Sequence, residues 1–321
     1  MHDTPQVIDV GNNVFAVDTH YVRPLMDASH LIVQDGRAAF VDTGTSHSVP
    51  HLLDALAGRG LSTDDVDYVF LTHIHLDHAG GAGTLLRQLP NAKAVLHPRG
   101  APHMIAPQKL IKGTRAVYGD EMYEALYGQI VALPEERVII VADGDRLSLA
   151  GREFEFIHTP GHALHHYCMV DAAHRAVFSG DTFGLSYRET DTAAGAFIFP
   201  TTTPTQFDPV AAHASIDRIV SYDPLCVYLT HYSRVENIAR LAGDLHRRLD
   251  QFVAIARRHV DSDDRVAAIG AHMRDYMKGE LDAHGYAGDD DSRESVLGGD
   301  MDLNAQGLDV WLHRLRKNGE I

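Results

Sequence analysis

Residues 71–81 read LTHIHLDHAGG, a stretch that places three imidazoles and one carboxylate within six residues, directly after a short apolar run. In an extended segment the side chains at positions i and i+2 point the same way, so His73 and His75 can bind one ion. Asp77 and His78 lie beyond the expected turn and can reach a second ion. Such a density of nitrogen and oxygen donors predicts a metal site.

Three further candidate ligands each stand at the end of an apolar, strand-like run. They are His162, Asp181 and His231. Loops that follow strands commonly carry the residues of a shared site. Each of these residues alone would be weak evidence, but together with the motif at 73–78 they predict one metal centre.

The remaining pattern predicts an α+β fold with two sheets. Residues 7–10 and 14–17 form one expected hairpin, and residues 31–33 and 38–41 flank Asp35-Gly36 in a second. Further strands are expected at residues 69–71, 94–96, 138–141, 153–157, 167–170, 176–179 and 226–229, and residues 48–58 have helical spacing. Two sheets flanked by helices indicate a four-layer αββα sandwich of two mixed sheets.

The last part of the chain has a different pattern. After about residue 234 the strand signals stop, and apolar residues recur every three or four positions, which predicts helices. Residues 287–302 are acidic and rich in glycine, so we expect a mobile loop there before a last amphipathic helix.

The composition limits the classes of partner. The 321 residues contain 28 Lys+Arg and 44 Asp+Glu, a formal net charge of −16, which argues against binding to nucleic acid or to an anionic membrane. No apolar run is long enough to span a membrane, and the first residues lead into no apolar signal region. Only two cysteines are present. We therefore expect a cytoplasmic protein, and the helical tail is compatible with a homodimer.

The order of these motifs resembles that of the metallo-β-lactamase-fold hydrolase superfamily. The resemblance rests on the H-x-H-x-D-H run, then His162, an Asp after Ser-Gly, and a His after a strand. Asp42 in Phe-Val-Asp-Thr-Gly is similar to the first motif of that superfamily. The likeness covers roughly residues 7–235, so we expect a catalytic domain over residues 1–239 and a helical C-terminal extension over residues 240–321.

The resemblance implies a set of ligands for two divalent metal ions. His73, His75 and His162 would hold metal one; Asp77, His78 and His231 would hold metal two; Asp181 would bridge them; and Asp42 would be a buried carboxylate that orients ligands. Nitrogen and oxygen donors without a thiolate suit Zn²⁺ first, but they also suit Fe²⁺ and Mn²⁺.

The function that the resemblance implies is hydrolysis by a metal-bridging hydroxide, with Asp77 among the catalytic residues. The expected substrate is a small, anionic ester, thioester or lactone, as in the glyoxalase II-like and lactonase-like branches. An iron-dependent oxidoreductase similar to persulfide dioxygenases remains an alternative because the same ligands suit iron. A phosphodiesterase is a further alternative, although the acidic balance of the chain disfavours nucleic-acid substrates.

Two regions are candidates for contact with the substrate. Residues 98–119 carry four basic side chains and no acidic one, so Lys109 and Arg115 could bind an anionic group. Tyr187 and Arg188 follow Asp181 closely, where a hydroxyl could donate to an oxyanion and a guanidinium could bind a carboxylate or phosphate.

Tyr232, next to His231, is a third candidate for a catalytic hydroxyl near the metals. Tyr118, Tyr123 and Tyr127 follow the basic stretch at spacings of five and four residues. This spacing predicts that at least two of these tyrosines pack in a helical core.

Overall fold

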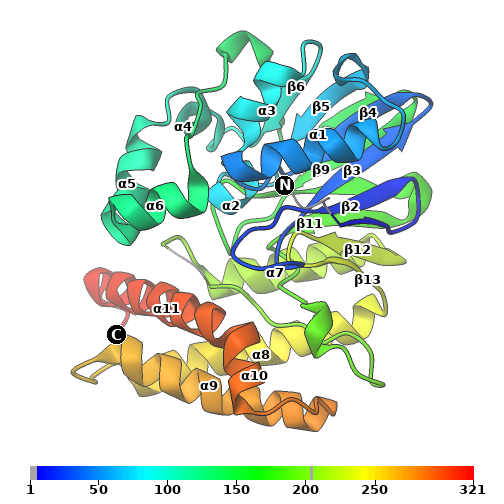
Figure 1. Ribbon diagram of the computed structural model, residues 1–321. Helices are drawn as coiled ribbons and strands as arrows, with labels where there is room; N and C mark the ends of the chain where they lie inside the picture. The colour runs from blue at the N-terminus through cyan, green and yellow to red at the C-terminus, as the bar shows by residue number, and fades with distance from the viewer. Residues whose placement is uncertain (1–5, 203–204) are drawn as a thin grey trace. The chain divides into compact units, whose positions relative to one another are not determined.

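The computed structural model describes residues 6–202 and 205–321 (Figure 1). Its contacts divide the chain into two compact units. The sheet unit comprises the described residues up to His158 together with 165–180 and 224–236. The helical unit comprises the described residues of 159–164, 181–223 and 237–321. The chain therefore passes several times between the two units.

The first sheet of the sheet unit contains seven strands in sequential order. Their bounds are β1 Val7–Asp9, β2 Val14–Asp18, β3 Ala28–Gln34, β4 Arg37–Val41, β5 Val66–Phe70, β6 Lys93–Leu96 and β7 Val138–Ile140. Strands β1 to β4 pair antiparallel, and β4 to β7 pair parallel. The parallel half brings the carboxyl ends of β4 and β5 to one edge of the sheet.

The second sheet contains six strands in the order β13-β12-β11-β10-β9-β8. Their bounds are β8 Arg146–Leu149, β9 Arg152–His158, β10 Tyr167–Asp171, β11 Ala176–Gly180, β12 Cys226–Leu229 and β13 Ser233–Val235. Only β11 and β12 pair parallel. The short strands β8 and β13 were not among the strands expected from the sequence.

The second predicted hairpin is confirmed, and its turn explains the register. Asp35 and Gly36 connect β3 to β4, with Gln34 opposite Arg37. Both turn residues have positive φ, 46° and 76°. Positive φ at both central positions is the requirement of a type I′ turn, whose twist matches that of the two strands.

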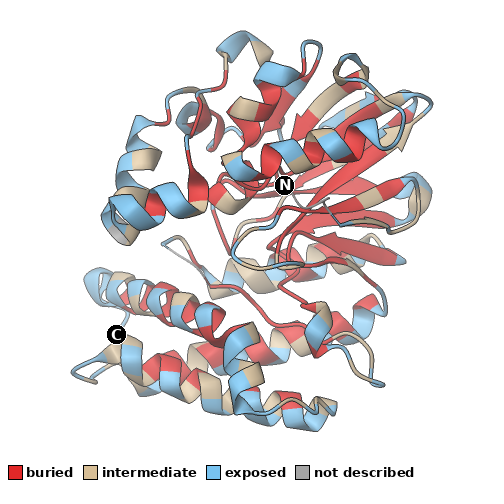
Figure 2. Ribbon diagram, viewed as in Figure 1, coloured by how far each residue is buried: buried red, intermediate tan, exposed pale blue. Residues whose placement is uncertain are grey.

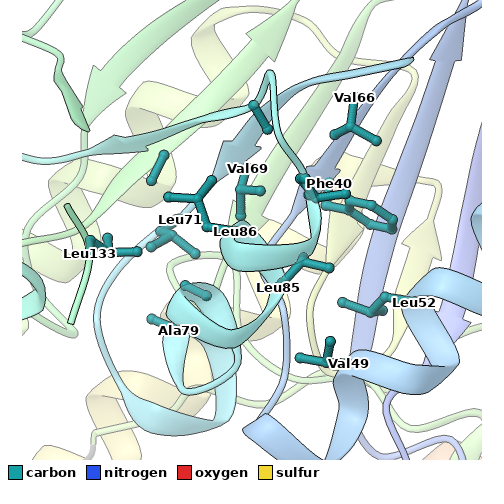
Figure 3. Close-up of a cluster of buried hydrophobic side chains, with 14 of the residues drawn as sticks. Phe40, Val49, Leu52, Val66, Val69, Leu71, Ala79, Leu85, Leu86 and Leu133 are labelled. Atoms are coloured by element: carbon teal, nitrogen blue, oxygen red, sulfur yellow. The ribbon is translucent and has the colours of Figure 1, made fainter. Parts of the chain in front are cut away.

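Apolar side chains fill the space between the two sheets and cover the outer face of the first. The inner cluster joins Ile32 and Phe70 of the first sheet to Phe156 and Phe178 of the second. The outer cluster packs helices α1 (Val49–Ala57) and α3 (Ala82–Gln88) on the first sheet, and Figure 3 shows members such as Leu52, Leu85 and Val69 meeting there. Strands β10, β11 and β12 are buried along their whole length, and Figure 2 shows long buried runs in the strands of the sheet unit.

The stretch 98–128, in which no strand was expected, is mainly helical. It contains α4 (Ala101–Ile105), α5 (Gln108–Tyr118) and α6 (Asp120–Tyr127). Buried Tyr123 and Tyr127 pack with Leu76, so these helices are anchored next to α2 (Leu76–Ala79) of the histidine motif. The prediction that two of the tyrosines pack in a helical core is confirmed.

The helical unit is built from long amphipathic helices, as Figure 2 shows by their alternating buried and exposed residues. Its helices are α7 Pro209–Ser221, α8 Ile238–Arg258, α9 Arg265–His284, α10 Asp290–Arg293, the π-helical turn η6 Glu294–Gly298 and α11 Gly299–Asn318. Short 3₁₀ turns occur at Ser46–Ser48, Thr63–Asp65, Glu135–Arg137, Ala172–His174 and Arg188–Thr190. No helix of the described residues has the length and apolar content that a membrane span requires.

The expectation of a mobile loop at residues 287–302 was wrong, because helical structure begins at Asp290. Asp289 caps α10 by accepting from the Ser292 amide, and Lys278 pairs with Asp290 at 2.5 Å. Arg274 pairs with Glu294 at 3.0 Å. Lys278 and Arg274 lie on α9, so the composition of residues 287–302 alone could not reveal these two ion pairs.

The predicted fold class, an α+β fold of two mixed sheets with helices and a helical C-terminal region, is confirmed. The boundary between residues 239 and 240 stays a prediction. Helix α8 starts at Ile238, close to that boundary, but the helical unit also includes 159–164 and 181–223.

His30 on β3 gives the fold a testable dependence on pH. Its ring is buried against Phe178 at 5.7 Å and Tyr228 at 5.6 Å between centroids. Burial lowers the pKa of His30 from 6.5 to about 4, although the Asp42 carboxylate opposes the shift. The folded chain therefore binds fewer protons than the unfolded chain between these pH values, and the stability present above pH 6.5 is lost as the pH falls through about 4.

We predict that the free energy of unfolding changes between pH 4 and pH 7 by on the order of 3 kcal/mol less in His30→Gln than in the wild type, because the glutamine does not titrate. Denaturant unfolding between pH 4 and pH 7 measures the effect. His103→Gln, on the exposed side of α4, controls for the substitution itself. Parallel stability curves for the wild type and His30→Gln would contradict the prediction.

Candidate metal centre

The histidine motif lies where β5 leaves the first sheet. His73 and His75 lie on the extended segment after β5, and Asp77 and His78 lie on α2. His73 and His78 are completely buried, whereas the side chain of Asp77 is 24% exposed. The Nε2 atom of His73 lies 2.8 Å from Nδ1 of His75, so the two rings present nitrogens to the same point. The local sequence thus places four candidate donors within six residues.

Three donor atoms converge within the sheet unit. Oδ2 of Asp77 lies 3.7 Å from Nε2 of His78 and 3.6 Å from Nε2 of His231. One donor atom of each residue lies within 4.8 Å of the others. His231 reaches this point because it follows β12, while α2 supplies the other two side chains. Two imidazoles and one carboxylate at these separations suit a divalent cation with room for a further ligand.

The outer nitrogens of both imidazoles have acceptors that fix the ring orientation. Nδ1 of His78 lies 2.8 Å from the Asp42 carboxylate, and Nδ1 of His231 lies 2.9 Å from the main-chain oxygen of Met26. A carbonyl oxygen can only accept, and an ionised carboxylate can only accept, so each Nδ1 carries the proton. Each Nε2 then presents a lone pair toward Asp77, as a metal ligand requires.

The buried carboxylate of Asp42 connects several strand ends. Its oxygens accept from the Thr72 amide at 2.8 Å, from the Thr72 hydroxyl at 2.8 Å and from the Thr230 hydroxyl at 2.9 Å. The Thr72 oxygen also lies 3.2 Å from Nδ1 of His73. Since the Thr72 proton is donated to Asp42, His73 donates from Nδ1 and keeps a lone pair on Nε2. Asp42 therefore orients His78 directly and His73 through Thr72.

The helical unit carries the remaining two predicted ligands as a pair. Nε2 of His162 lies 3.4 Å from Oδ2 of Asp181, and both side chains are buried. A cavity of about 20 Å³ adjoins them and is lined further by Thr182, Thr201 and Leu245 among others. The predicted ligands of metal one are thus found as two pairs, His73 with His75 in the sheet unit and His162 with Asp181 in the helical unit.

Gly180, the last residue of β11, is required by its surroundings. Its φ is +47°, and a Cβ atom there would lie 2.6 Å from Nε2 of His166 and 2.6 Å from the Thr72 hydroxyl. A side chain at this position would displace the residues that support the metal centre. In the Ser-Gly-Asp motif the glycine is therefore needed for steric reasons, and the aspartate is the predicted ligand.

Tyr187 and Arg188, predicted to contact the substrate, are engaged inside the helical unit. The buried Tyr187 hydroxyl donates to Asp300 at 3.0 Å. The Arg188 guanidinium donates to the Ser186 carbonyl at 2.6 Å and pairs with Asp191 at 3.2 Å. A role in substrate binding would require these hydrogen bonds to be exchanged, and it stays a prediction.

Tyr232 lies in the sheet unit and is 1% exposed. Its ring packs with Ala16 and Ala28, and Ile8 and Leu25 border the cluster. This packing fixes the segment that follows His231. The predicted catalytic role of Tyr232 stays a prediction.

The basic character of residues 98–119 is offset by the next helix. Arg115 pairs with Asp120 at 2.7 Å and also with Glu124, and its guanidinium lies 4.3 Å from the Tyr123 ring centroid. Lys109 is exposed on α5. The acidic residues that pair with Arg115 follow directly after the stretch that was read as basic, so Arg115 is not an isolated cation.

Three phenols lie near Asp77: Tyr118 and Tyr127, for which the sequence predicted only helical packing, and Tyr21, which was not predicted. The Tyr21 and Tyr127 hydroxyls lie 3.2 Å apart, and the Tyr118 ring stands edge-on to Tyr127 with centroids 5.7 Å apart. Burial raises the pKa of all three phenols, and the nearby Asp77 carboxylate raises each pKa further. All three therefore remain protonated donors at neutral pH. Tyr21 gave no signal in the sequence because its neighbours are distant in the chain.

Asp27 is a second missed residue beside this site. It is completely buried, and its Oδ2 accepts from the Thr19 hydroxyl at 3.0 Å. Burial raises the pKa of Asp27 to about 7, while the nearby His231 and His78 lower it. The carboxyl group adds a titratable proton close to the three converging donors.

The chain matches a known family. The family model of the metallo-β-lactamase superfamily matches residues 22–231, and the chain belongs to this superfamily. The metallo-β-lactamase fold-containing protein ST1585 of Sulfurisphaera tokodaii is 28% identical over 195 residues, which cover 60% of this chain and 67% of the relative.

Solved structures show the same fold. The structure of ST1585 from Sulfolobus tokodaii matches with a TM-score of 0.63 at 21% identity, covering 95% of this chain and 98% of that one. The family protein TTHA1429 from Thermus thermophilus matches with a TM-score of 0.66 at 19% identity, covering 97% and 95%. The chemotaxis sensor ODP, in a peroxy diiron species, matches with a TM-score of 0.53 at 15% identity, covering 76% and 94%.

We predict that Asp42→Asn weakens metal binding by about 10- to 100-fold, because an amide cannot accept from all the donors that surround this position. Chelator competition, with metal content measured by elemental analysis, tests the effect. Thr230→Val removes one hydrogen bond to Asp42 but keeps the carboxylate, so it should have a smaller effect. Unchanged affinity in a folded Asp42→Asn protein would contradict the proposed role of this carboxylate.

Proposed function

We propose that this chain is a metal-dependent hydrolase that uses two divalent cations to cleave a small ester, thioester or lactone. The observation that carries the proposal is the convergence of Asp77, His78 and His231, with the outer nitrogen of each imidazole hydrogen-bonded to an acceptor. Three protein ligands with oriented imidazoles are typical of catalytic metal sites, which leave a position open for water, and this supports the proposal. We also expect the protein in the cytoplasm.

The connectivity of the chain supports a second ion. Asp181 is bonded directly to Gly180 of β11, and Gly180 pairs with Leu229 of the parallel strand β12, two residues before His231. His162 follows the end of β9 by four residues. Each ligand therefore leaves the second sheet near a strand terminus, and we propose that His162 and Asp181 complete a site with His73 and His75.

The donors fit divalent cations that prefer imidazole and carboxylate. Zn²⁺ is the first expectation, and Fe²⁺ and Mn²⁺ suit the same donors. Cations bound there would supply a water of lowered pKa at neutral pH and would polarise the attacked carbonyl oxygen. The chain itself contributes ring orientation through Asp42 and Met26. It also contributes the Asp77 carboxylate, which lies beside both Nε2 atoms.

The surrounding side chains bear on the kind of substrate. Arg115 and Arg188 are each paired with carboxylates, so the charge of an anionic substrate would be met chiefly by the cations. The Tyr21 and Tyr127 hydroxyls are neutral donors near Asp77. We propose that they hydrogen-bond an oxygen of the substrate next to the metal centre.

The main test combines metal analysis with a substrate panel. We predict two metal ions per chain and turnover of an ester, thioester or lactone without consumption of O₂. Asp77→Asn should lower kcat by at least about 100-fold and weaken the binding of one of the two ions, because it removes a ligand and a charge. Asp54→Asn on the exposed face of α1 is the control.

Three outcomes would decide against this function. Full activity with one ion or fewer would contradict the binuclear site. Activity that needs Fe²⁺, consumes O₂ and survives Asp77→Asn would assign the chain to the oxidoreductases instead. Turnover of phosphodiesters alone would favour the phosphodiesterase alternative.

The phenols give a separate prediction with a matched control. Tyr127→Phe should lower kcat/KM about 10-fold at unchanged metal content, since it removes one hydrogen bond. The control is Tyr123→Phe. Tyr123 lies on the same helix and in the same cluster as Tyr127, and its hydroxyl has no hydrogen-bond partner among the described residues. This substitution should leave kcat/KM unchanged. Equal effects of the two substitutions would show that the hydroxyls do not contact the substrate.

A further inference from the structure

A second cluster of histidines and aspartates lies in the helical unit. His213 and Asp217 are four residues apart on α7, and His246 and Asp250 are four residues apart on α8. Residues at this spacing share one face of a helix. The two helices contact each other (Figure 1), and the four side chains meet at that contact.

The hydrogen bonds of the cluster cross between the helices in both directions. Nε2 of His213 on α7 lies 3.1 Å from Asp250 on α8, and Nε2 of His246 on α8 lies 3.0 Å from Asp217 on α7. Because an ionised carboxylate only accepts, each Nε2 carries a proton. Each Nδ1 of the neutral rings then presents a lone pair.

The two Nδ1 atoms face each other at 2.6 Å. The ring planes differ by only 12° and the centroids are 4.9 Å apart, so the rings lie nearly edge to edge rather than face to face. Two lone pairs at this distance repel each other unless a positive charge lies between them. The geometry therefore requires a cation, either a proton shared by the rings or a metal ion.

We propose that His213 and His246 form a metal site that binds one borderline divalent cation, such as Ni²⁺, Cu²⁺ or Zn²⁺, through their Nδ1 atoms. A carboxylate on the far nitrogen of each metal-binding histidine is the arrangement that strengthens such ligands. Imidazole nitrogens prefer these metals, and water completes the coordination.

The side chains have room to adjust to an ion. Metal–nitrogen distances of about 2.0 Å in a tetrahedral site separate the two nitrogens by about 3.3 Å, so the rings must open by several tenths of an ångström. The His213 and His246 side chains are 29% and 28% exposed, which leaves them free to turn and leaves space for water. A bound ion would link α7 to α8 and stabilise the helical unit.

The chain contains a matched control at the end of α8. His259 and His272 also approach each other, with Nε2 of His259 3.0 Å from Nδ1 of His272. The partner of the other His259 nitrogen is the Ser262 hydroxyl at 3.4 Å, not a carboxylate. This pair tests whether two neighbouring imidazoles alone suffice.

The experiment uses the full chain with the metal that it carries as purified. Equilibrium dialysis against Ni²⁺, with nickel and resident metal measured together, distinguishes added ions from exchanged ones. We expect one Ni²⁺ in addition to the resident metal in the wild type and in His259→Gln. His213→Gln and His246→Gln should lose this ion and keep the resident metal.

The carboxylates provide the second arm of the test. The double variant Asp217→Asn with Asp250→Asn keeps both imidazoles, so it should still bind Ni²⁺, but about 10- to 100-fold more weakly. Equal uptake of Ni²⁺ by the wild type and His246→Gln would overturn the proposal, as would loss of the ion in His259→Gln. Absence of any added Ni²⁺ in the wild type would leave a shared proton as the cation and would also overturn it.

Discussion

The geometry of the candidate metal centre depends on the hydrogen bonds that the buried Asp42 carboxylate accepts. Ionised carboxylates are costly to bury unless donors surround them, and here the donors come from Thr72, His78 and Thr230. These residues follow β5, lie on α2 and follow β12. One charge therefore ties the end of the first sheet to the end of the second, and the same hydrogen bonds orient His78 directly and His73 through Thr72.

The sequence predicted those parts of the structure whose determinants are local. The motif at 73–78 and the turn at Asp35-Gly36 each contain the residue types that their geometry requires within a few positions. The metal-ligand candidates that follow strands could also be proposed from the sequence, because a histidine or aspartate after an apolar run is a local signal. The sandwich fold was indicated by the strand and helix pattern, and the order of these motifs in the chain gave the resemblance to a family with that fold.

Features that depend on distant partners were not predictable in the same way. Tyr21 meets Tyr127 across 106 residues, and Tyr187 donates to Asp300 across 113 residues. The ion pairs of Arg115 come from the helix that follows the stretch counted as basic. Counting charge along a segment therefore overestimated the free positive charge, because pairing depends on packing rather than on composition.

The candidate metal centre and the proposed site on α7 and α8 would use the same chemistry in different surroundings. At His78 and His231, as at His213 and His246, an acceptor on the outer nitrogen leaves the inner nitrogen as a lone pair. His78 is completely buried, so its orientation is fixed before any ion binds. His213 and His246 are partly exposed, so solvent competes for their hydrogen bonds. The buried site should therefore bind its ion more tightly, because less orientational freedom is lost when the ion enters.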